Sequence, residues 1–404
     1  MTRSVRVTRG VVLLVAACMM TAGAAHKSLC FGDGFLERSL TLVCYSDLLP
    51  LYEAEELDSG KIPYVEAENE YPVGTGLFMW VASWPVDSRE AFFASNAVLL
   101  ALLGLLTAWL LYGVVQRRAL YFAAAPTLAL YAFLNWDLLA VALMTAGLVA
   151  FLRRRDVAAG VLLGLGAAAK LFPGLLLPPL ALDRARERSW RGVVVLLGSA
   201  VVIWLAVNLP VAIASPGGWS FTFRFNAIRP THWATLWFVG CRVLPVFCRS
   251  VPLVNALSFA LFLSAVLAVW YLKSRFEPEF PVWTFGFPIL IVFLLTNKVY
   301  SPQYSLWLLP WFALVLPQLR VFLAFEAADV FVFVTEFRWL GAATGAGAGA
   351  PRWLFLLAVL TRAAVLLWML GAYVRGPTSA VAPTRCSLPS GHGVREPAPE
   401  AISA

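Results

Sequence analysis

The sequence predicts an all-α polytopic membrane protein, a bundle of about 10–12 transmembrane helices with one long loop near the N-terminus. Of its 404 residues, 60% are hydrophobic and only 13% are charged, and the mean hydropathy is +0.77. Apolar runs long enough to cross a bilayer recur along the chain. The basic residues, which give a net charge of +8, lie in short clusters between these runs. Such clusters are typical of cytoplasmic loops, so the charge does not indicate nucleic-acid binding.

The expected spans follow from counting apolar runs of about 20 residues and keeping the basic loops cytoplasmic. A first span over 11–25 carries the chain outward into a long loop, outer loop 1, at about residues 26–93. Later spans are expected on either side of "NWD" (residues 135–137) and at 94–115, 192–212, 253–272, 282–296, 303–317, 321–337 and 352–374. With both termini cytoplasmic, residues 1–375 form one domain, and residues 376–404, rich in Pro, Ser, Ala and Gly, form a disordered tail.

The apolar segment 157–182 lies between two basic clusters, so a single crossing would place one cluster outside. Lys170 and Pro173 interrupt the middle of this segment. We therefore expect two short half-spans that turn around near Lys170. Such a broken segment is tolerated where it is buried in protein or lines a cavity.

Outer loop 1 carries about half of the protein's 23 acidic residues. An amphipathic helix is expected here, lying on the membrane surface. Its apolar side is formed by Leu48, Leu49, Tyr52 and Leu57, and its wet side by Glu53, Glu55 and Glu56. Most of the loop's carboxylates are expected to be solvated. Asp47 precedes this helix near headgroup depth, where it either caps the helix or serves a polar reaction on a lipid-attached substrate.

Two further segments place polar side chains at the outer ends of spans. In "NWD", Asn135 and Asp137 have apolar surroundings, and the Asp137 carboxylate needs a partner such as Lys170 or Lys298. This pair is either a structural ion pair or part of a substrate site. In "TNKVYSPQYSLWLLPW", Lys298 supplies a cation and hydrogen-bonding groups come from Tyr300, Ser301, Gln303 and Tyr304. These groups suit a phosphate between apolar walls, or an aromatic anchor at the membrane interface.

The loop 213–252 alternates basic and aromatic residues, with Arg224, Arg229 and His232 among several Trp and Phe residues. This pattern fits a lipid phosphate or a stacked sugar ring, and equally a loop that dips into the membrane interface. Two cysteine pairs fall in the outer loops, Cys30 with Cys44 and Cys241 with Cys248. Each pair is either a disulfide formed in an oxidising compartment or two free thiols.

Several motifs are absent from the sequence. It has no Walker-type phosphate loop, no GxGxxG after a strand, and no Cys/His spacing for a metal. We therefore expect no cofactor and no metal. A water-soluble nucleotide donor has no domain in which to bind, so an activated donor should be carried by the membrane.

Three stretches together resemble the GT-C superfamily of integral-membrane glycosyltransferases, and most closely family 87. That bacterial family includes polyprenyl-phosphate-mannose-dependent α-1,2-mannosyltransferases. The stretches are "SDLLPLYEAEELDSGKIPYVEAENEYP", "NWDLLAVALMTAGLVAFLRRRDVAAGVLLGLGAAAKLFPGLLLP" and "NKVYSPQYSLWLLPW". Asp47 matches the loop-one acid of the family, Lys170 its Lys-Pro motif, and Lys298 and Gln303 its late polar motif. Tyr71-Pro72-Val73 departs from the "YPP" that is frequent in the family.

The resemblance implies a GT-C-like bundle in the plasma membrane that transfers a sugar, mannose, from polyprenyl phosphate to a glycolipid or glycan on the extracytoplasmic face. Asp47 would act as general base in an inverting attack, with Glu70 the second candidate. The donor phosphate would be bound by Lys298, Arg224, His232 and Gln303, and the substrate by Asn135, Asp137, Lys170, Tyr300 and Tyr304. Two other classes stay open: a transporter or flippase for a lipid-linked sugar, and a non-catalytic subunit of an envelope-assembly complex.

Overall fold

Helices make up the regular structure of the computed structural model, which describes residues 7–346 and 349–378. In these residues no strand forms, and one isolated bridge joins Pro63 to Ala67. Five helical segments are long and apolar enough to cross a membrane: Arg9–Ser28, Arg89–Ala123, Trp190–Ala214, Val251–Phe276 and Arg352–Arg375. The protein is therefore an all-α polytopic membrane protein, as the sequence predicts.

The first half of the chain contains α1 (Arg9–Ser28), α2 (Phe35–Leu42), α3 (Leu51–Ala54), α4 (Val73–Ser83), α5 (Arg89–Val115), α6 (Leu120–Ala123), α7 (Pro126–Tyr131), α8 (Asp137–Leu152), α9 (Asp156–Ala169), the 3₁₀ helix η2 (Phe172–Leu176) and α10 (Leu177–Arg186). The second half contains α11 (Trp190–Ala214), α12 (Pro216–Ile228), α13 (Leu236–Val243), α14 (Val251–Phe276), α15 (Gly286–Thr296), the 3₁₀ helix η5 (Pro302–Leu308), α16 (Leu309–Leu314), α17 (Leu319–Thr344) and α18 (Arg352–Arg375).

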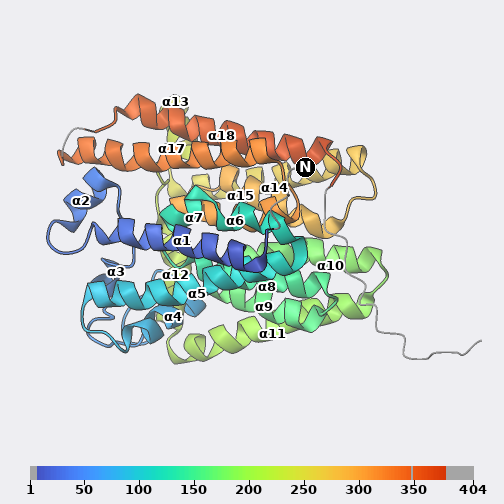
Figure 1. Ribbon diagram of the computed structural model, residues 1–404, viewed down its shortest axis with the longest axis horizontal. Coiled ribbons are helices and arrows are strands. Elements are labelled where there is room, and N and C mark those ends of the chain that lie inside the picture. The colour runs from blue at the N-terminus through green and yellow to red at the C-terminus, as the bar shows by residue number, and fades with distance from the viewer. Residues whose placement is uncertain (1–6, 347–348, 379–404) are drawn as a thin grey trace, which may run out of the picture.

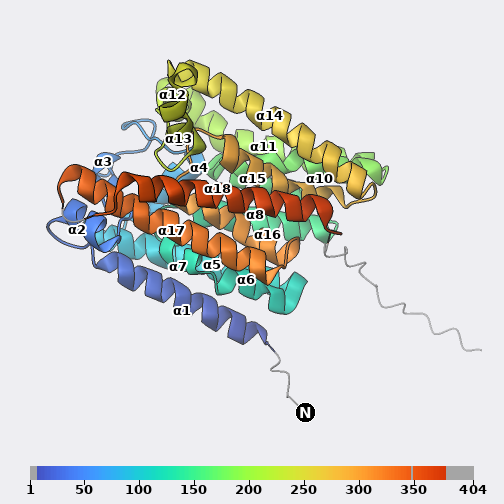
Figure 2. The same ribbon diagram turned by 90° about the horizontal axis from the view of Figure 1, so that it is seen from above.

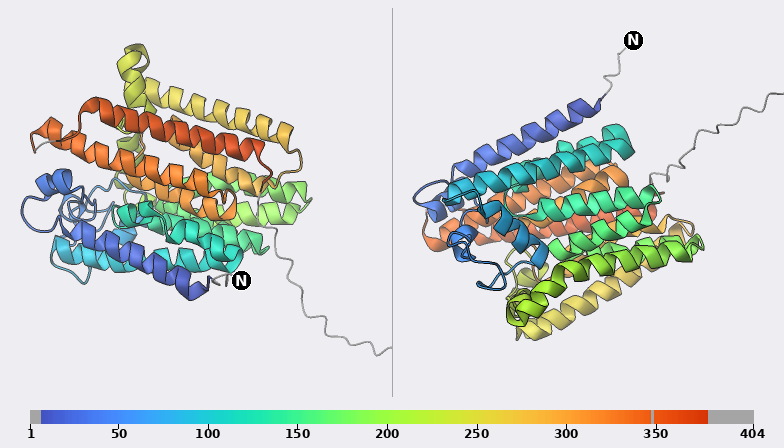
Figure 3. Two further views of the ribbon diagram at one scale, coloured as in Figure 1. Left: turned by 45° about the horizontal axis from the view of Figure 1, so that its top comes forward. Right: turned by 90° about the horizontal axis from the view of Figure 1, so that it is seen from below.

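The long helices run roughly side by side, and the short helices α2, α3 and α12 gather towards one end of the bundle (Figures 1 and 2). Helices α1 and α14 lie at opposite edges, as the view from below also shows (Figure 3). Inside, α9 packs between α8 and α11, and α17 packs along α18. The elements of outer loop 1 therefore lie at the same end as α12.

The segment between α8 and α11 reverses direction at Lys170, as predicted. Helix α9 ends at Ala169, Lys170 is extended, and η2 and α10 lead back. The basic clusters on either side of the segment lie at the same end of the bundle, because Arg184 pairs with Asp156 at 2.8 Å and Arg154 pairs with Glu187. The reversal leaves Lys170 at the opposite end, where outer loop 1 lies.

Several sequence predictions differ from the structure. The expected span 303–317 consists of the 3₁₀ helix η5 followed by the short helix α16. The expected span before "NWD" is not one helix: α6 and α7 are short, and Pro126, which lacks an amide hydrogen, begins α7 as its first residue. The expected surface helix is one turn, α3. The apolar residues assigned to its membrane side are instead buried inside the protein. Glu55 on the predicted wet side is also buried, and it accepts a hydrogen bond from the Glu70 amide. The tail predicted at 376–404 lies outside the described residues beyond position 378.

Outer loop 1 is packed firmly against α12. Gly218 of α12 lies so close to the Tyr64 carbonyl oxygen that a Cβ atom would stand 1.8 Å from it. One turn further on, the Thr222 hydroxyl donates to the Tyr71 carbonyl oxygen at 2.6 Å. This contact fixes the end of α12, and the residues that follow it, beside the acidic loop.

Candidate active site

A cavity of about 780 Å³ opens where outer loop 1 meets α12, the Lys170 turn, η5 and α17. Its polar lining includes eight of the eleven residues that the sequence analysis predicts to be catalytic or to bind phosphate or substrate, namely Asp47, Glu70, Asn135, Lys170, His232, Lys298, Gln303 and Tyr304. These residues come from segments far apart in the chain, so the fold brings most of the predicted site together.

Asp47 is held at the cavity wall by its backbone and by its side chain. Its amide donates to the Leu134 carbonyl oxygen at 2.8 Å, and the neighbouring Ser46 hydroxyl donates to the Phe133 carbonyl oxygen at 2.6 Å. The Asn135 amide donates to Asp47 Oδ2 at 2.7 Å, and the Tyr45 hydroxyl also donates to the carboxylate. The carboxylate is therefore oriented by neutral donors.

The two candidate bases belong to one hydrogen-bonded chain. Asn135 Nδ2, which contacts Asp47, also lies 2.7 Å from the Tyr71 hydroxyl oxygen. The Tyr71 hydroxyl in turn donates to the carboxylate of Glu70. Asn135 is itself fixed, because its Oδ1 accepts the Trp136 amide at 2.6 Å. A change in the charge of one carboxylate therefore changes the pKa of the other.

Burial raises the pKa of both carboxyl groups above their ordinary values. For Asp47, the hydrogen bonds from Asn135 and Tyr45 and the charges of Lys170 and Arg229 oppose this rise in pKa. For Glu70, the negative charge of Asp47 adds to the effect of burial on the pKa. A raised pKa strengthens a carboxylate as a base, provided that it is still ionised at the working pH.

Three cationic side chains line the same cavity: Lys170, Arg229 and Lys298. The Lys170 ammonium contacts Asp137 Oδ2 at 2.5 Å and lies 4.8 Å from the ring centroid of Tyr304. Lys298 Nζ donates to the Ala227 carbonyl oxygen at 3.3 Å, and burial and the charge of Arg229 lower the pKa of Lys298. Among the described residues Arg229 makes no ion pair and contacts the Phe225 ring at 5.7 Å. Its charge is thus available to an anion.

Asp137 does not line the cavity but lies behind its wall. It is fully buried, and its Oδ1 accepts the Trp307 indole at 2.5 Å while its Oδ2 pairs with Lys170. Of the two sequence interpretations, the structure favours the structural ion pair. Asp137 thereby fixes the position of the Lys170 ammonium.

Besides Asp137, two residues predicted to bind substrate or phosphate lie outside the cavity. Arg224 is exposed, and its guanidinium donates back to the Gly217 carbonyl oxygen at 2.9 Å. Arg229 from the same loop lines the cavity in its place. The Tyr300 ring is buried 3.6 Å beneath the Arg362 guanidinium, and its hydroxyl contacts Ser305. Arg224 and Arg229 face different directions because five residues rotate a helix by about 140°.

The remaining walls of the cavity are apolar. On one side lie Leu171, Phe172, Leu175, Phe293 and Trp307, and on another Leu36, Leu40, Phe337 and Leu340. The Trp307 ring is stacked on both Phe172 and Tyr304, with centroids 4.1 and 4.2 Å apart. The cavity thus combines cations, carboxylates and apolar surfaces.

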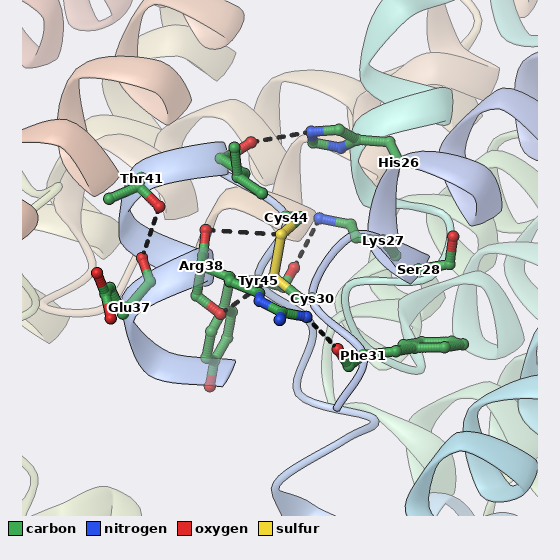
Figure 4. The surroundings of a disulfide bond; sticks show 12 residues. His26, Lys27, Ser28, Cys30, Phe31, Glu37, Arg38, Thr41, Cys44 and Tyr45 are labelled. Carbon is green, nitrogen blue, oxygen red and sulfur yellow. Dashed lines mark hydrogen bonds between the residues drawn. A yellow bond between two sulfur atoms is a disulfide. The ribbon is translucent and has the colours of Figure 1, made fainter. Parts of the chain in front are cut away.

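The structure joins Cys30 to Cys44 and Cys241 to Cys248, with Cα atoms 5.7 and 5.5 Å apart. The first bridge lies three residues before Asp47 and ties that segment to the end of α1 (Figure 4). Beside it, the Lys27 ammonium donates to the Tyr45 carbonyl oxygen at 2.6 Å. Bridge and ammonium together restrain the backbone that carries Tyr45 and Asp47.

The sequence interpretation passed over three functional candidates in the wall of the cavity: Tyr45, Tyr71 and Glu336. The tyrosines follow no pattern that distinguishes them from anchoring aromatics. Glu336 could have been found, since an ionisable residue inside an expected span is unusual. Among the described residues, no cluster of His, Cys, Asp and Glu has the arrangement of a metal site.

No profile of a known protein family matches the chain, and no curated protein matches it. Among solved structures, the chain is similar to the crystal structure of ArnT from Cupriavidus metallidurans bound to undecaprenyl phosphate. The identity is 15% and the TM-score 0.47, over 91% of this chain and 78% of that chain. It is also similar to the Archaeoglobus fulgidus oligosaccharyltransferase tethered with an acceptor peptide, at 12% identity and a TM-score of 0.35. That match covers 91% of this chain and 55% of that chain.

Proposed function

We propose that this protein is a membrane glycosyltransferase that moves a sugar, mannose, from polyprenyl phosphate to a hydroxyl group of a glycolipid or polysaccharide. The observation that carries the proposal is the Asp47 carboxylate, held by Asn135 and Tyr45 in the wall of a cavity that also contains cations and apolar surfaces. The resemblance of the sequence to family 87 of the GT-C superfamily supports it. We place the cavity on the extracytoplasmic face of the plasma membrane, with both termini cytoplasmic.

In this mechanism Asp47 is the general base. The acceptor hydroxyl transfers its proton to the Asp47 carboxylate as its oxygen attacks the anomeric carbon. The bond from that carbon to the phosphate oxygen breaks, and polyprenyl phosphate leaves with the electron pair. A base of this kind contributes roughly 10²–10⁴ in rate. One direct displacement inverts the configuration, so a β-linked donor gives an α-linked product.

The cations bind the donor phosphate and stabilise the charge that it gains as the bond breaks. Arg229 is the best placed, because it lines the cavity and makes no contact ion pair among the described residues. Lys298 contributes a second positive charge from a buried position. Lys170 is already paired with Asp137. We therefore propose that Lys170 orients the substrate and that Arg229 and Lys298 bind the phosphate.

The apolar wall formed by Phe172, Leu175 and Phe293 suits the first isoprene units of the donor. Cations beside an apolar wall favour a lipid-linked sugar over a nucleotide sugar, which has no lipid to bury there. The donor then reaches the cavity from the bilayer. Its phosphate lies near the cations and its anomeric carbon lies towards Asp47.

The experiment that tests this function is transfer by the purified protein in lipid nanodiscs. Labelled β-linked polyprenyl-phosphate-mannose is supplied with a panel of glycolipid acceptors, and the anomeric configuration of the product is determined by NMR. An α-linked product is expected. A β-linked product would require a second displacement and would contradict the role of Asp47. If the protein gives no product, it is reconstituted into vesicles; movement of the labelled lipid from one leaflet to the other would then identify a flippase.

A further inference from the structure

Helix α17 contributes a carboxylate to the cavity that the proposed mechanism does not use. Glu336 is 2% exposed and lines the cavity beside His232 and Trp233. Its Oε1 accepts the indole hydrogen of Trp233 at 2.5 Å, but its Oε2 is buried with no hydrogen-bond partner in the protein. Leaving such an oxygen unpaired costs stability, so a protein retains it where a ligand completes it.

Arg362 of α18, whose charge acts on Glu336, makes its contacts with other groups. The Arg362 guanidinium donates to Asp329 Oδ1 at 3.3 Å and to the Ala234 carbonyl oxygen at 2.6 Å. It also lies over the Tyr300 ring. Glu336 therefore makes no salt bridge with Arg362.

His232 presents a hydrogen-bond donor next to this acceptor. The Ala234 amide donates to His232 Nδ1 at 3.3 Å, so the proton of the neutral ring lies on Nε2. Burial, together with the charges of Arg229 and Arg362, lowers the pKa of His232 to about 3, which keeps the ring neutral. His232 Nε2 lies 3.8 Å from Glu336 Oε1, too far for a hydrogen bond.

A donor and an acceptor side by side select a group that can both accept and donate. A phosphate is disfavoured next to Glu336, because an ionised carboxylate repels it. A cationic ligand is disfavoured by Arg229, Lys298 and Arg362 around the same part of the cavity. A neutral hydroxyl group meets both requirements. Asp47 lines the same cavity as Glu336, and the two segments are in contact, because the Phe337 ring lies 5.6 Å from the Tyr45 ring.

We infer that Glu336 and His232 form a subsite for one hydroxyl group of a sugar, which donates to Glu336 and accepts from His232 Nε2–H. The choice of a sugar as the ligand rests on the proposed function. The hydroxyl belongs either to the sugar of the donor lipid or to the acceptor. In both cases Glu336 and His232 bind the sugar, whereas Arg229 and Lys298 bind the phosphate.

The test is a binding measurement in nanodiscs, which does not depend on turnover. In the first arm, the affinity for decaprenyl-phosphate-mannose is divided by the affinity for bare decaprenyl phosphate. Glu336→Gln is expected to lower this ratio by about tenfold, the loss of one hydrogen bond to a charged group. His232→Asn is expected to lower it as well. The matched control is Glu326→Gln, because Glu326 is equally buried on α17 but is satisfied by Thr127 and does not line the cavity.

The second arm identifies the source of the hydroxyl group. Methyl α-mannoside is titrated into protein saturated with bare decaprenyl phosphate. A loss of affinity in Glu336→Gln in this arm alone assigns the hydroxyl to the acceptor, and a loss in the first arm assigns it to the donor. Unchanged values in both arms for Glu336→Gln and His232→Asn would overturn the subsite.

The affinity for bare decaprenyl phosphate shows whether each variant is folded, and His232→Asn replaces Glu336→Gln if the latter does not bind it. The subsite and the proposed function fail in different ways. If the wild type transfers the sugar and the affinity ratio is unchanged in the variants, the proposed function is supported and the subsite is rejected. If the affinity ratio falls in the variants but the wild type transfers no sugar, the subsite is supported and the proposed function is rejected.

Discussion

Asp47 and Asp329 are enclosed carboxylates in neighbouring polar clusters, yet their partners differ. Asp329 is fully buried, lies 3.3 Å from the Arg362 guanidinium, and accepts the Ser305 hydroxyl at 2.7 Å. Asp47 faces the cavity and accepts hydrogen bonds from the neutral groups of Asn135 and Tyr45. Among the described residues Asp47 makes no ion pair.

This difference separates a structural carboxylate from one that is available for chemistry. A contact cation neutralises Asp329, so removing either partner leaves a buried charge. Neutral donors orient Asp47 and leave it able to accept a proton from a ligand. A position in the cavity wall, together with hydrogen bonding to neutral groups instead of a cation, therefore marks the candidate base.

The largest effect is expected when the ion pair between Asp329 and Arg362 is broken. Asp329→Asn leaves Arg362 without its partner and is expected to lower the free energy of unfolding by about 3–5 kcal/mol. The midpoint of thermal unfolding in detergent measures the loss. The double variant Asp329→Asn/Arg362→Met removes both charges and should recover most of the stability. An Asp329→Asn protein as stable as the wild type would contradict the structural role of the pair.

The next effect concerns the two disulfides. Replacing Cys30 and Cys44 by Ser is expected to cost about 3 kcal/mol of unfolding free energy, because the bridge restrains a loop of the unfolded chain. It should also lower the transfer rate, since the bridge restrains the segment of Asp47. The matched control replaces Cys241 and Cys248, which close a shorter loop. Equal loss of transfer in both variants would show that the first bridge has no special part in the site.

A smaller effect is expected from Asn135, which orients Asp47 without touching the reacting atoms. Asn135→Leu is expected to lower kcat by roughly 10–100-fold through misplacement of the carboxylate. The donor KM should change little. Because the lost hydrogen bond stabilises the charged form, the pKa of Asp47 should rise and the acidic limb of the pH–rate profile should move to higher pH. A fall in kcat with an unmoved limb would argue against this positioning role.

The smallest effects are two opposite shifts of the acidic limb. Arg229→Gln removes a positive charge that lowers the pKa of Asp47, so the limb should move to higher pH. Glu70→Gln removes a negative neighbour, so the pKa of Asp47 should fall and the limb should move to lower pH. Profiles of kcat against pH for both variants measure the shifts. Shifts in the same direction would show that a group other than Asp47 sets this limb.

Much of the fold and of the candidate site could be predicted from the sequence. The reversal at Lys170 followed from basic clusters that must share one side of the membrane. Asp47, Asn135 and Lys298 could be predicted because polar residues at the outer ends of apolar spans converge on one end of a bundle. The GT-C-like arrangement and the mannose donor stay predictions.

Other parts of the site depend on side-chain direction, which the sequence does not encode simply. Arg224 and Arg229 stand in one loop with similar neighbours, and only the packing of α12 on outer loop 1 decides which faces the cavity. Tyr300 was paired with the phosphate site, but the distant Arg362 covers it. Glu336 is 289 positions from Asp47 (336 − 47), so no local pattern joins them.

The most direct test of the central claim compares the wild type with Asp47→Asn and Glu70→Gln in nanodiscs containing labelled polyprenyl-phosphate-mannose and a glycolipid acceptor. The wild type should transfer the sugar, and Asp47→Asn should reduce the rate roughly 10²–10⁴-fold with donor affinity unchanged. Glu70→Gln should retain most of the activity. Transfer by Asp47→Asn at the wild-type rate, with activity abolished in Glu70→Gln, would show that the base is Glu70 and not Asp47.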